Sequence, residues 1–127
     1  MRYLLDTHTF IWGCVDSDKL SDTAKKIVDD TSEHKYLSVA SIWEFAIKYS
    51  MGKLLFEGGL PRLYEIASLY DLTILPITET YIASVIELPF IHRDPFDRIL
   101  VATAKADGMT ILTADENIHK YDVEFVW

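Results

Sequence analysis

The sequence has little cysteine, few basic residues and no long apolar run. Its single cysteine, Cys14, excludes an intrachain disulfide and a metal site built from several thiolates. The longest apolar runs, such as FIWGCV, fall far short of the roughly 18 residues that a membrane-spanning helix needs. The opening MRYLLDTHTF reaches an acid too early to contain the apolar centre of a signal peptide. These absences together predict a cytoplasmic protein that does not enter a membrane.

Basic residues are outnumbered: 12 Lys and Arg face 20 Asp and Glu, which leaves a formal net charge of −8. Proteins that coat nucleic acids without sequence preference use basic side chains to neutralise phosphates, so this charge argues against that class. An enzyme that meets a nucleic acid through bound cations remains compatible with it, and a basic protein partner would suit it. The tryptophans are interpreted as core or interface residues rather than base-stacking platforms: Trp12, Trp43 and Trp127.

Apolar residues are abundant, since half of the 127 residues are hydrophobic and a quarter are charged. This composition is typical of a globular protein. The length corresponds to one domain, residues 1–127, with a sizeable core. No internal repeat, low-complexity tract or linker rich in proline, glycine or serine divides the chain.

Short apolar runs alternate along the chain with stretches of helical periodicity. Strands are expected at residues 2–6, 35–39, 72–77, 109–114 and 123–127, and helices at residues 20–32, 41–52, 60–71, 78–88, 95–107 and 115–121. Strands that read as nearly continuous apolar runs between helices predict an α/β fold, with a parallel sheet covered on both faces. Ligands of such sheets bind beyond the carboxyl ends of the strands.

Four acids from distant stretches fall at that expected edge, each at the end of a strand or early in a helix: Asp6, Glu44, Asp97 and Asp115. Each alone has a structural explanation, because helix starts prefer acidic and hydroxyl side chains. Asp6 would cap a helix that begins at Thr7. Ser41 with Glu44, and Thr113 with Glu116, have capping-box spacing. A role at a helix start is the better explanation of any one acid, but the same edge collects all four.

Glu44 gives the sharpest single signal. In SIWEFAIKY its neighbours are apolar nearly all round the helix, and a thin polar stripe remains at Ser41, Glu44 and Lys48. A solvent-facing Glu44–Lys48 pair would contribute only about 0.3–0.5 kcal/mol. A helix with so much apolar surface is mostly buried, however, so we expect its polar stripe to line a cleft.

Carboxylates gathered in one cleft repel one another strongly. Two unit charges about 4 Å apart interact by about 4 kcal/mol at an effective dielectric constant of about 20. Such a group therefore binds protons or a multivalent cation, and an all-oxygen site suits Mg²⁺ or Mn²⁺. These ions activate water and clamp phosphate oxygens, which points to phosphodiester hydrolysis.

The segment HRDPFDR, residues 92–98, contains two acids at the start of one helix. Pro95 favours the first helical position, which makes Asp94 the N-cap and leaves the carboxylate of Asp97 freer to hold a metal. Three basic side chains flank these acids: His92, Arg93 and Arg98. They either contact substrate phosphates or are solvated charges at a helix start. The arginine beside Asp97 is the better candidate for contact.

Four segments, LLDTHTFIW, SIWEFAIKYSMGKL, HRDPFDRILVATAKADG and ILTADENIHKY, resemble the successive motifs of PIN-domain ribonucleases. More narrowly, they resemble VapC-type toxins of bacterial toxin–antitoxin pairs, and they cover nearly the whole chain in order. The resemblance implies a three-layer α/β/α domain with a central parallel sheet. It also implies an endonuclease that cleaves RNA with Mg²⁺ or Mn²⁺, is inhibited by a cognate antitoxin and forms a homodimer.

The same resemblance assigns roles to particular residues. The family's three principal acids and its more variable fourth acid are matched, in this order, by Asp6, Glu44, Asp97 and Asp115. Thr113 matches a hydroxyl residue that often supports the site. Many relatives carry serine or asparagine two residues after the first acid, where this chain has His8. The resemblance therefore assigns no supporting role near Asp6 to this position.

Two other functions are compatible with clustered acids. A phosphotransfer or phosphatase-type α/β domain also binds Mg²⁺ through them. It needs further acids close to Asp6 and a lysine near the site, and neither is evident in DTHTF or after Asp115. A non-catalytic binding module would keep the same fold without hydrolysis, although all four acids are present.

Overall fold

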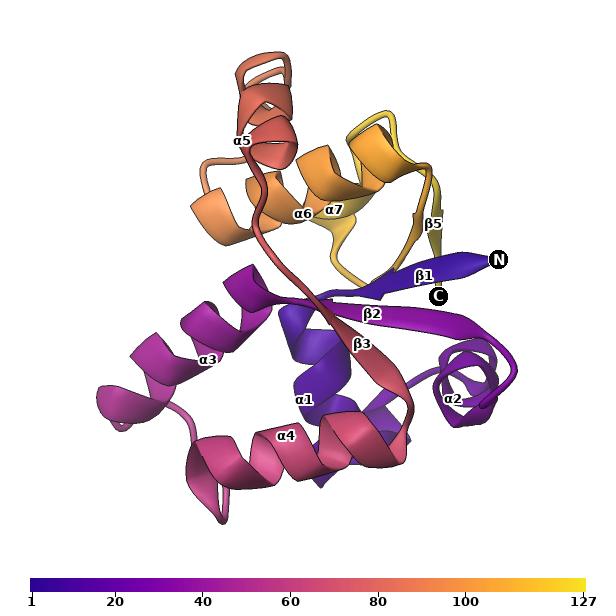
Figure 1. Cartoon of the computed structure of the whole chain (residues 1–127), viewed down its shortest axis with the longest axis vertical. Coiled ribbons are helices and arrows are strands. Elements are labelled where there is room, and N and C mark those ends of the chain that lie inside the picture. Colours follow the sequence, from indigo (N-terminus) through magenta and orange to yellow (C-terminus); the bar gives the residue numbers. More distant parts are fainter.

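A five-stranded parallel sheet forms the centre of the molecule (Figure 1). The computed structural model describes residues 1–127. The strands are β1 (Arg2–Leu5), β2 (His34–Ser38), β3 (Leu72–Leu75), β4 (Thr110–Leu112) and β5 (Phe125–Val126). They run parallel in the order β3-β2-β1-β4-β5, and Leu5 of β1 is level with Leu37 of β2 and Leu112 of β4. The predicted parallel sheet is therefore confirmed.

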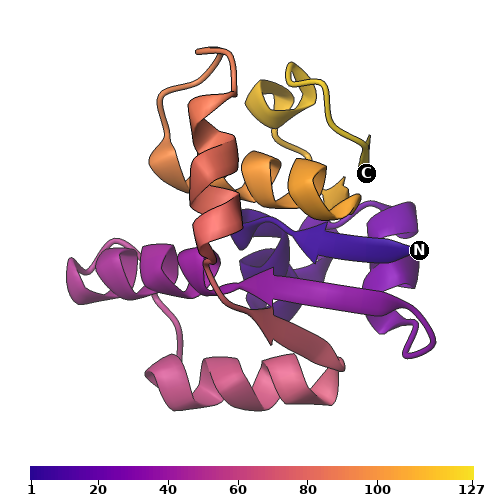
Figure 2. The same cartoon turned by 45° about the horizontal axis from the view of Figure 1, so that its top comes forward.

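Helices lie on both sides of this sheet and give three layers (Figures 1 and 2). One side carries α1 (Thr7–Val15), α2 (Asp22–Asp29), α3 (Val39–Ser50) and α4 (Gly59–Leu69), with a 3₁₀ turn, η1, at Ser17–Lys19. The other side carries α5 (Glu79–Ile86), α6 (Pro95–Asp107) and α7 (Glu116–His119). The expected α/β/α arrangement is thus present. None of these helices combines the length and the apolar surface that crossing a bilayer requires.

The core is divided by the sheet, because successive side chains of a strand point to opposite faces. Leu5 of β1 belongs to a cluster of 15 buried residues that includes Phe10 of α1 and Leu63 of α4. Its neighbour Leu4 belongs to a cluster of 10 buried residues on the other face, which includes Leu100 of α6. Both faces of the central strand are apolar, which explains why the strands read as continuous apolar runs.

The helix α1 is the one long helix that is not among the predicted elements, apart from the remark that Asp6 would cap a helix at Thr7. The segment THTFIWGCV shows no stripe of polar residues at helical spacing. Its polar residue Thr9 is buried together with the apolar Phe10 and Ile11. Its β-branched residues and its glycine also lower helix propensity. Tertiary packing decides its structure. The other helices match the predicted ranges to within a few residues, and α6 matches at both ends.

The carboxyl ends of β1, β2 and β4 meet at one edge of the sheet, and each is followed at once by a helix or by a short turn into one. The start of α6 reaches the same edge because α3 and α6 are in contact. There the rings of Trp43 and Phe96 pack edge to face with centroids 5.2 Å apart. These aromatic residues are the chain neighbours of Glu44 and Asp97, so their contact draws the two acids together.

Candidate active site

Asp6 lies where β1 turns into α1, and only 4% of its surface is exposed. It is the N-cap of α1, since its Oδ1 accepts a 2.6 Å hydrogen bond from the backbone N–H of Thr9. Its Oδ2 accepts a short hydrogen bond from the hydroxyl of Thr113. Burial raises the pKa of Asp6 above its ordinary value, and these hydrogen bonds offset only part of that effect. Groups from α1 and from the end of β4 therefore fix the orientation of this carboxylate.

Thr113 and Asp115 connect the end of β4 to the same place. The fully buried Thr113 hydroxyl, which donates to Asp6, also accepts a 3.0 Å hydrogen bond from the backbone N–H of Asp115. Asp115 caps α7, because its Oδ1 accepts a 2.8 Å hydrogen bond from the backbone N–H of Asn117. The cap is therefore Asp115 itself, and the capping box of Thr113 with Glu116 is wrong.

Glu44 is buried as well, with 4% of its surface exposed. Its Oε2 accepts a 2.8 Å hydrogen bond from Nζ of Lys48, one helical turn further along α3. The predicted Glu44–Lys48 pair is therefore present, but it does not face solvent on both sides, because the Glu44 carboxylate is buried. Ser38 caps α3, so the alternative of a capping box at Ser41 is wrong. The hydroxyl of Ser41 is instead buried without a protein partner.

Asp97 lies in the first turn of α6, next to the cap predicted for this helix. Oδ1 of Asp94 accepts hydrogen bonds from the backbone N–H groups of Phe96, at 2.8 Å, and of Asp97, at 3.2 Å. Pro95 occupies the first turn, so the assignment of Asp94 as N-cap is confirmed. Oδ2 of Asp97 lies 3.2 Å from Nε2 of His92. The sequence does not predict the contact between His92 and Asp97, because the two residues lie on opposite sides of the capping turn.

The carboxylate of Asp97 is surrounded by the other acids of the site. The pKa of Asp97 is raised to about 8, and burial is the largest cause. The negative charges of four other carboxylates raise it further, and their effects decrease in the order Asp94, Asp115, Glu44 and Asp6. Each of these acids therefore lies near enough to repel Asp97. The fold brings together the four acids that the sequence placed at one sheet edge.

The atoms of this acidic cluster fit a hard divalent cation. Carboxylate oxygens are the ligands that Mg²⁺ and Mn²⁺ prefer, and a cation would relieve the repulsion that acts on Asp97. Potential ligand atoms of His92, Asp94 and Asp97 lie within 4.8 Å of one another. The four predicted acids do not form such a tight group. An ion such as Mg²⁺ keeps several of its waters, so some of these carboxylates would hold it through a water molecule rather than directly.

We expect the stability of the metal-free protein to fall as the pH rises. The folded state keeps the Asp97 proton up to about pH 8, whereas the unfolded chain releases it near its ordinary pKa of 3.8. Between these values the folded state binds more protons, so the free energy of unfolding decreases with pH. Urea unfolding in EDTA across this range measures the slope. Asp97→Asn is the control, and an equal slope in both proteins contradicts this origin.

Arg98 is buried, and its guanidinium is bonded to other parts of the protein rather than free to contact a substrate phosphate. Only 7% of its surface is exposed. Its guanidinium donates to the carbonyl oxygens of Pro89, at 2.9 Å, and Val85, at 3.3 Å, and to the hydroxyl of Tyr121, at 3.2 Å. The prediction that Arg98 contacts substrate phosphate is therefore corrected to a structural role, in which Arg98 joins α6 to the last turn of α5 and to the segment that follows it. Arg93 is exposed and stays a proposed contact.

Two alanine variants are expected to separate these arginines. Arg98→Ala leaves buried carbonyl groups without a donor and should lower the free energy of unfolding by about 2–4 kcal/mol. Arg93→Ala removes an exposed side chain and should change it by about 0.5 kcal/mol or less. If Arg93 contacts a phosphate, its loss also reduces the salt dependence of RNA binding by about one unit of slope. Urea unfolding and RNA binding at several salt concentrations measure both. The reverse pattern contradicts the assignment.

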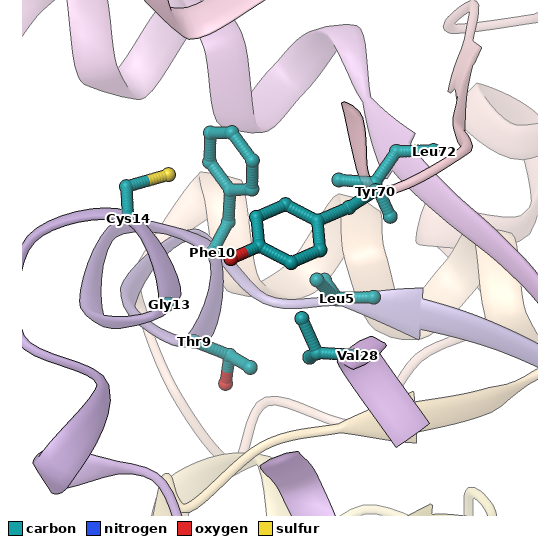
Figure 3. A pocket seen from close by; sticks show the side chains of 8 residues that line it. All are labelled: Leu5, Thr9, Phe10, Gly13, Cys14, Val28, Tyr70 and Leu72. Carbon is teal, nitrogen blue, oxygen red and sulfur yellow. The ribbon is translucent and has the colours of Figure 1, made fainter. Parts of the chain in front are cut away.

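Two hollows differ in their relation to the acids. An open hollow of about 240 Å³ adjoins them and is lined by Asp6, His8, Trp12, Ala114 and Asp115. The other, shown in Figure 3, lies between α1, β1 and the start of β3 and has a volume of about 10 Å³, at most enough for one water molecule. Burial raises the pKa of the Cys14 thiol beside it to about 12, which makes this thiol a poor nucleophile. This small, mostly apolar cavity is therefore a packing gap in the core and carries no chemistry.

Comparison with known protein families gives a match over nearly the whole chain. The model of the PIN domain family matches residues 3–124, a range that contains all four acids. Among curated proteins, Ribonuclease VapC22 from Mycobacterium tuberculosis is 27% identical to this chain over 120 residues. That alignment covers 93% of this chain and 90% of the relative.

Solved structures of other proteins have the same fold. A chain in the crystal structure of VapBC2 from Rickettsia felis, bound to a DNA fragment from its promoter, superposes with a TM-score of 0.72 at 13% identity, and the match covers 99% of this chain and 98% of that one. FitAcB from Neisseria gonorrhoeae superposes with a TM-score of 0.68 at 22% identity, over 98% of this chain and 96% of that one. Identities this low establish the fold alone.

Proposed function

This chain belongs to the PIN-domain family, and we propose on that premise that it is a Mg²⁺- or Mn²⁺-dependent endoribonuclease, the toxin of a toxin–antitoxin pair. The observation that carries the proposal is the gathering of four acids from four distant segments at the carboxyl edge of the sheet: Asp6, Glu44, Asp97 and Asp115. The similarity to Ribonuclease VapC22 and to chains of the VapBC2 and FitAcB structures supports it.

The four acids are the proposed ligands of the ion, and nearby groups hold them in place. When bound, the ion supplies positive charge to the scissile phosphate and acidifies water for attack on it. Thr113 orients Asp6 through its hydroxyl and holds the backbone of Asp115 at the same time. Lys48 orients Glu44, and His92 lies within reach of Asp97. Such partners behind the ligands tune both orientation and affinity.

A cleavage assay tests the proposal. Single-stranded fluorogenic RNA is incubated with the protein in Mg²⁺, in Mn²⁺ and in EDTA, and cleavage is expected only with the metal ions. Asp97→Asn, purified in the same way, controls for contaminating nucleases. Cleavage that persists in EDTA contradicts metal dependence. No cleavage of any RNA in either metal favours the alternative of a non-catalytic binding module. The phosphotransfer alternative is not supported by the family match.

The proposed antitoxin places a basic side chain among the carboxylates, where the metal ion binds. The acidic site and the net charge of −8 suit such a residue. An apolar rim beside the site, made by Phe96 and by Trp43 with 59% of its surface exposed, offers area for the rest of a peptide.

We expect the complex with this partner to be inactive, and replacement of the inserted Arg or Lys by Ala to restore cleavage by about tenfold or more, since buried charge pairs are costly to break. Initial rates of the intact and substituted complexes measure the effect. A structure in which the partner protects RNA while the acidic cleft stays open contradicts this mechanism.

We also propose that the chain forms a homodimer and acts in the cytoplasm. Exposed apolar side chains near α5, at Ile82, Ile86 and Phe90, give an unpartnered surface that supports self-association. Light scattering after size exclusion determines the mass in solution. Charged substitutions at Ile82 and Ile86 then test whether this surface is used.

A further inference from the structure

We propose that the open hollow beside the acids binds a nucleobase next to the cleaved phosphodiester, with Trp12 as the surface on which the base stacks. The hollow, of about 240 Å³, is lined by Asp6, His8, Trp12, Ala114 and Asp115. This inference rests on the proposed ribonuclease function, because it concerns the same site. It replaces the interpretation of Trp12 as a core or interface residue only.

The position of the hollow follows from the residues that it shares with the acidic site. Asp6 and Asp115 line it and belong to the proposed metal ligands. A phosphate held at these acids is joined to its nearest bases through one ribose on either side. The base of a flanking nucleotide therefore has the hollow within reach, while the phosphate stays at the acids.

The charge of the hollow favours a base over a phosphate. Its lining contains two carboxylates and no lysine or arginine, so a second phosphate would be repelled there. A base is neutral near pH 7 and carries no such penalty. The indole of Trp12, the imidazole of His8 and the methyl group of Ala114 supply flat or apolar wall. These are the kinds of surface on which unpaired bases stack in single-strand binding.

Trp12 is held in a fixed orientation before any ligand arrives. Its ring lies 5.9 Å from that of His8, on the preceding turn of α1, and 6.1 Å from that of Trp127, which meets it edge-on. The side chain also packs against the core cluster that contains Phe10. A ring that is already ordered loses little conformational entropy on binding. Stacking of one base on such a ring typically changes affinity by about tenfold or more.

The first experiment compares RNA molecules that differ by one base. In a short RNA cleaved at one bond, each of the two flanking nucleotides is replaced in turn by an abasic ribose. The wild-type protein is expected to lose about tenfold or more in kcat/KM at one of these positions. Trp12→Ala is expected to show the same loss on intact RNA and no further loss on the abasic RNA. Trp12→Phe, which keeps a ring, should recover most of the rate.

Controls separate this role from a structural one. Tyr64→Ala removes an exposed aromatic ring of α4 that does not line the hollow, and it should keep the wild-type response to the abasic substitution. If Trp12→Ala slows intact and abasic RNA by the same factor, or slows neither, the base site is overturned. It is also overturned if Trp12→Ala weakens inhibition by a protein partner and leaves the base dependence unchanged.

A second readout does not require cleavage. The indole N–H resonance of Trp12, identified by its loss in Trp12→Phe, is followed in wild-type protein with Mg²⁺. The added RNA carries a non-hydrolysable linkage at the scissile bond and is either intact or abasic beside that linkage. A shift that intact RNA causes and abasic RNA does not cause supports the base site, even if no RNA is cleaved and the proposed catalysis fails. If RNA is cleaved but this resonance does not respond to either RNA, the base site is wrong and the ribonuclease proposal stands.

Discussion

Asp97→Asn is expected to lower RNA cleavage by about a hundredfold or more while leaving the fold intact. Asp97 is the acid that the charges of Asp94, Asp115, Glu44 and Asp6 surround. Loss of a residue behind a metal ligand already costs about 10–100-fold, and loss of a ligand should cost at least as much. Asparagine keeps the size of the side chain and is neutral at every pH, so folding without metal no longer requires the uptake of a proton at this position. Initial cleavage rates and melting temperatures measure both effects, and the melting temperature should stay level or rise.

Asp94 supplies the matched comparison at the same helix start. Its Oδ1 caps α6 through the backbone N–H groups of Phe96 and Asp97. Asp94→Ala removes the cap and should cost about 1 kcal/mol of stability, with part of the activity surviving. Asp94→Asn keeps a competent cap and should retain most of the cleavage. If Asp94→Asn abolishes cleavage and Asp97→Asn stays active, the two roles have been assigned the wrong way round.

Mg²⁺ or Mn²⁺ is expected to raise the melting temperature of the wild-type protein by about 10 °C at a hundredfold excess over the dissociation constant. An ion that binds only the folded state contributes about 2.7 kcal/mol at that concentration. For a domain of this size, one kcal/mol shifts the melting temperature by about 3–5 °C. The physical cause is relief of the repulsion that raises the pKa of Asp97. Thermal unfolding monitored by circular dichroism across a titration measures the shift.

Ionic strength must be separated from specific binding in this titration. A potassium salt at matched ionic strength screens surface charge without entering the site, and it should produce a much smaller shift. Asp97→Asn should also show a reduced response to the divalent ions. A wild-type melting curve that millimolar Mg²⁺ and Mn²⁺ leave unchanged contradicts the metal site, whatever the cleavage assay gives.

The start and the end of α6 illustrate what the sequence predicts well. Asp94 as the cap and Pro95 in the first turn are local features, because the bonds of a cap join residues two or three apart. The end of the helix is local as well, since Gly108 adopts φ of +65°, a conformation that glycine tolerates and most residues avoid. The placing of the acids at strand ends follows in the same way from short apolar runs.

Arg98 and His92 illustrate what the sequence does not predict. Arg98 adjoins Asp97 in the chain, but its guanidinium is buried against carbonyl groups of α5, at Val85, and of the segment after it, at Pro89. His92 reaches Asp97 only because the capping turn brings them together. The helix α1 is hidden for a related reason, since its polar threonines are buried and leave no stripe to read. Packing between distant segments decides each of these features.

The sequence by itself determined the parallel α/β architecture, the placing of four acids at one edge of the sheet and the cap of α6. These follow from periodicity and from bonds between near neighbours in the chain. Only the tertiary structure decided that Thr113 donates to Asp6, across 107 positions of sequence, and that the charges of the other acids act on Asp97. It also decided that Trp12 lines a hollow beside them. Burial and electrostatic repulsion depend on distances in space. For residues far apart in the sequence, those distances are set only when the strands pair and the helices pack on the sheet.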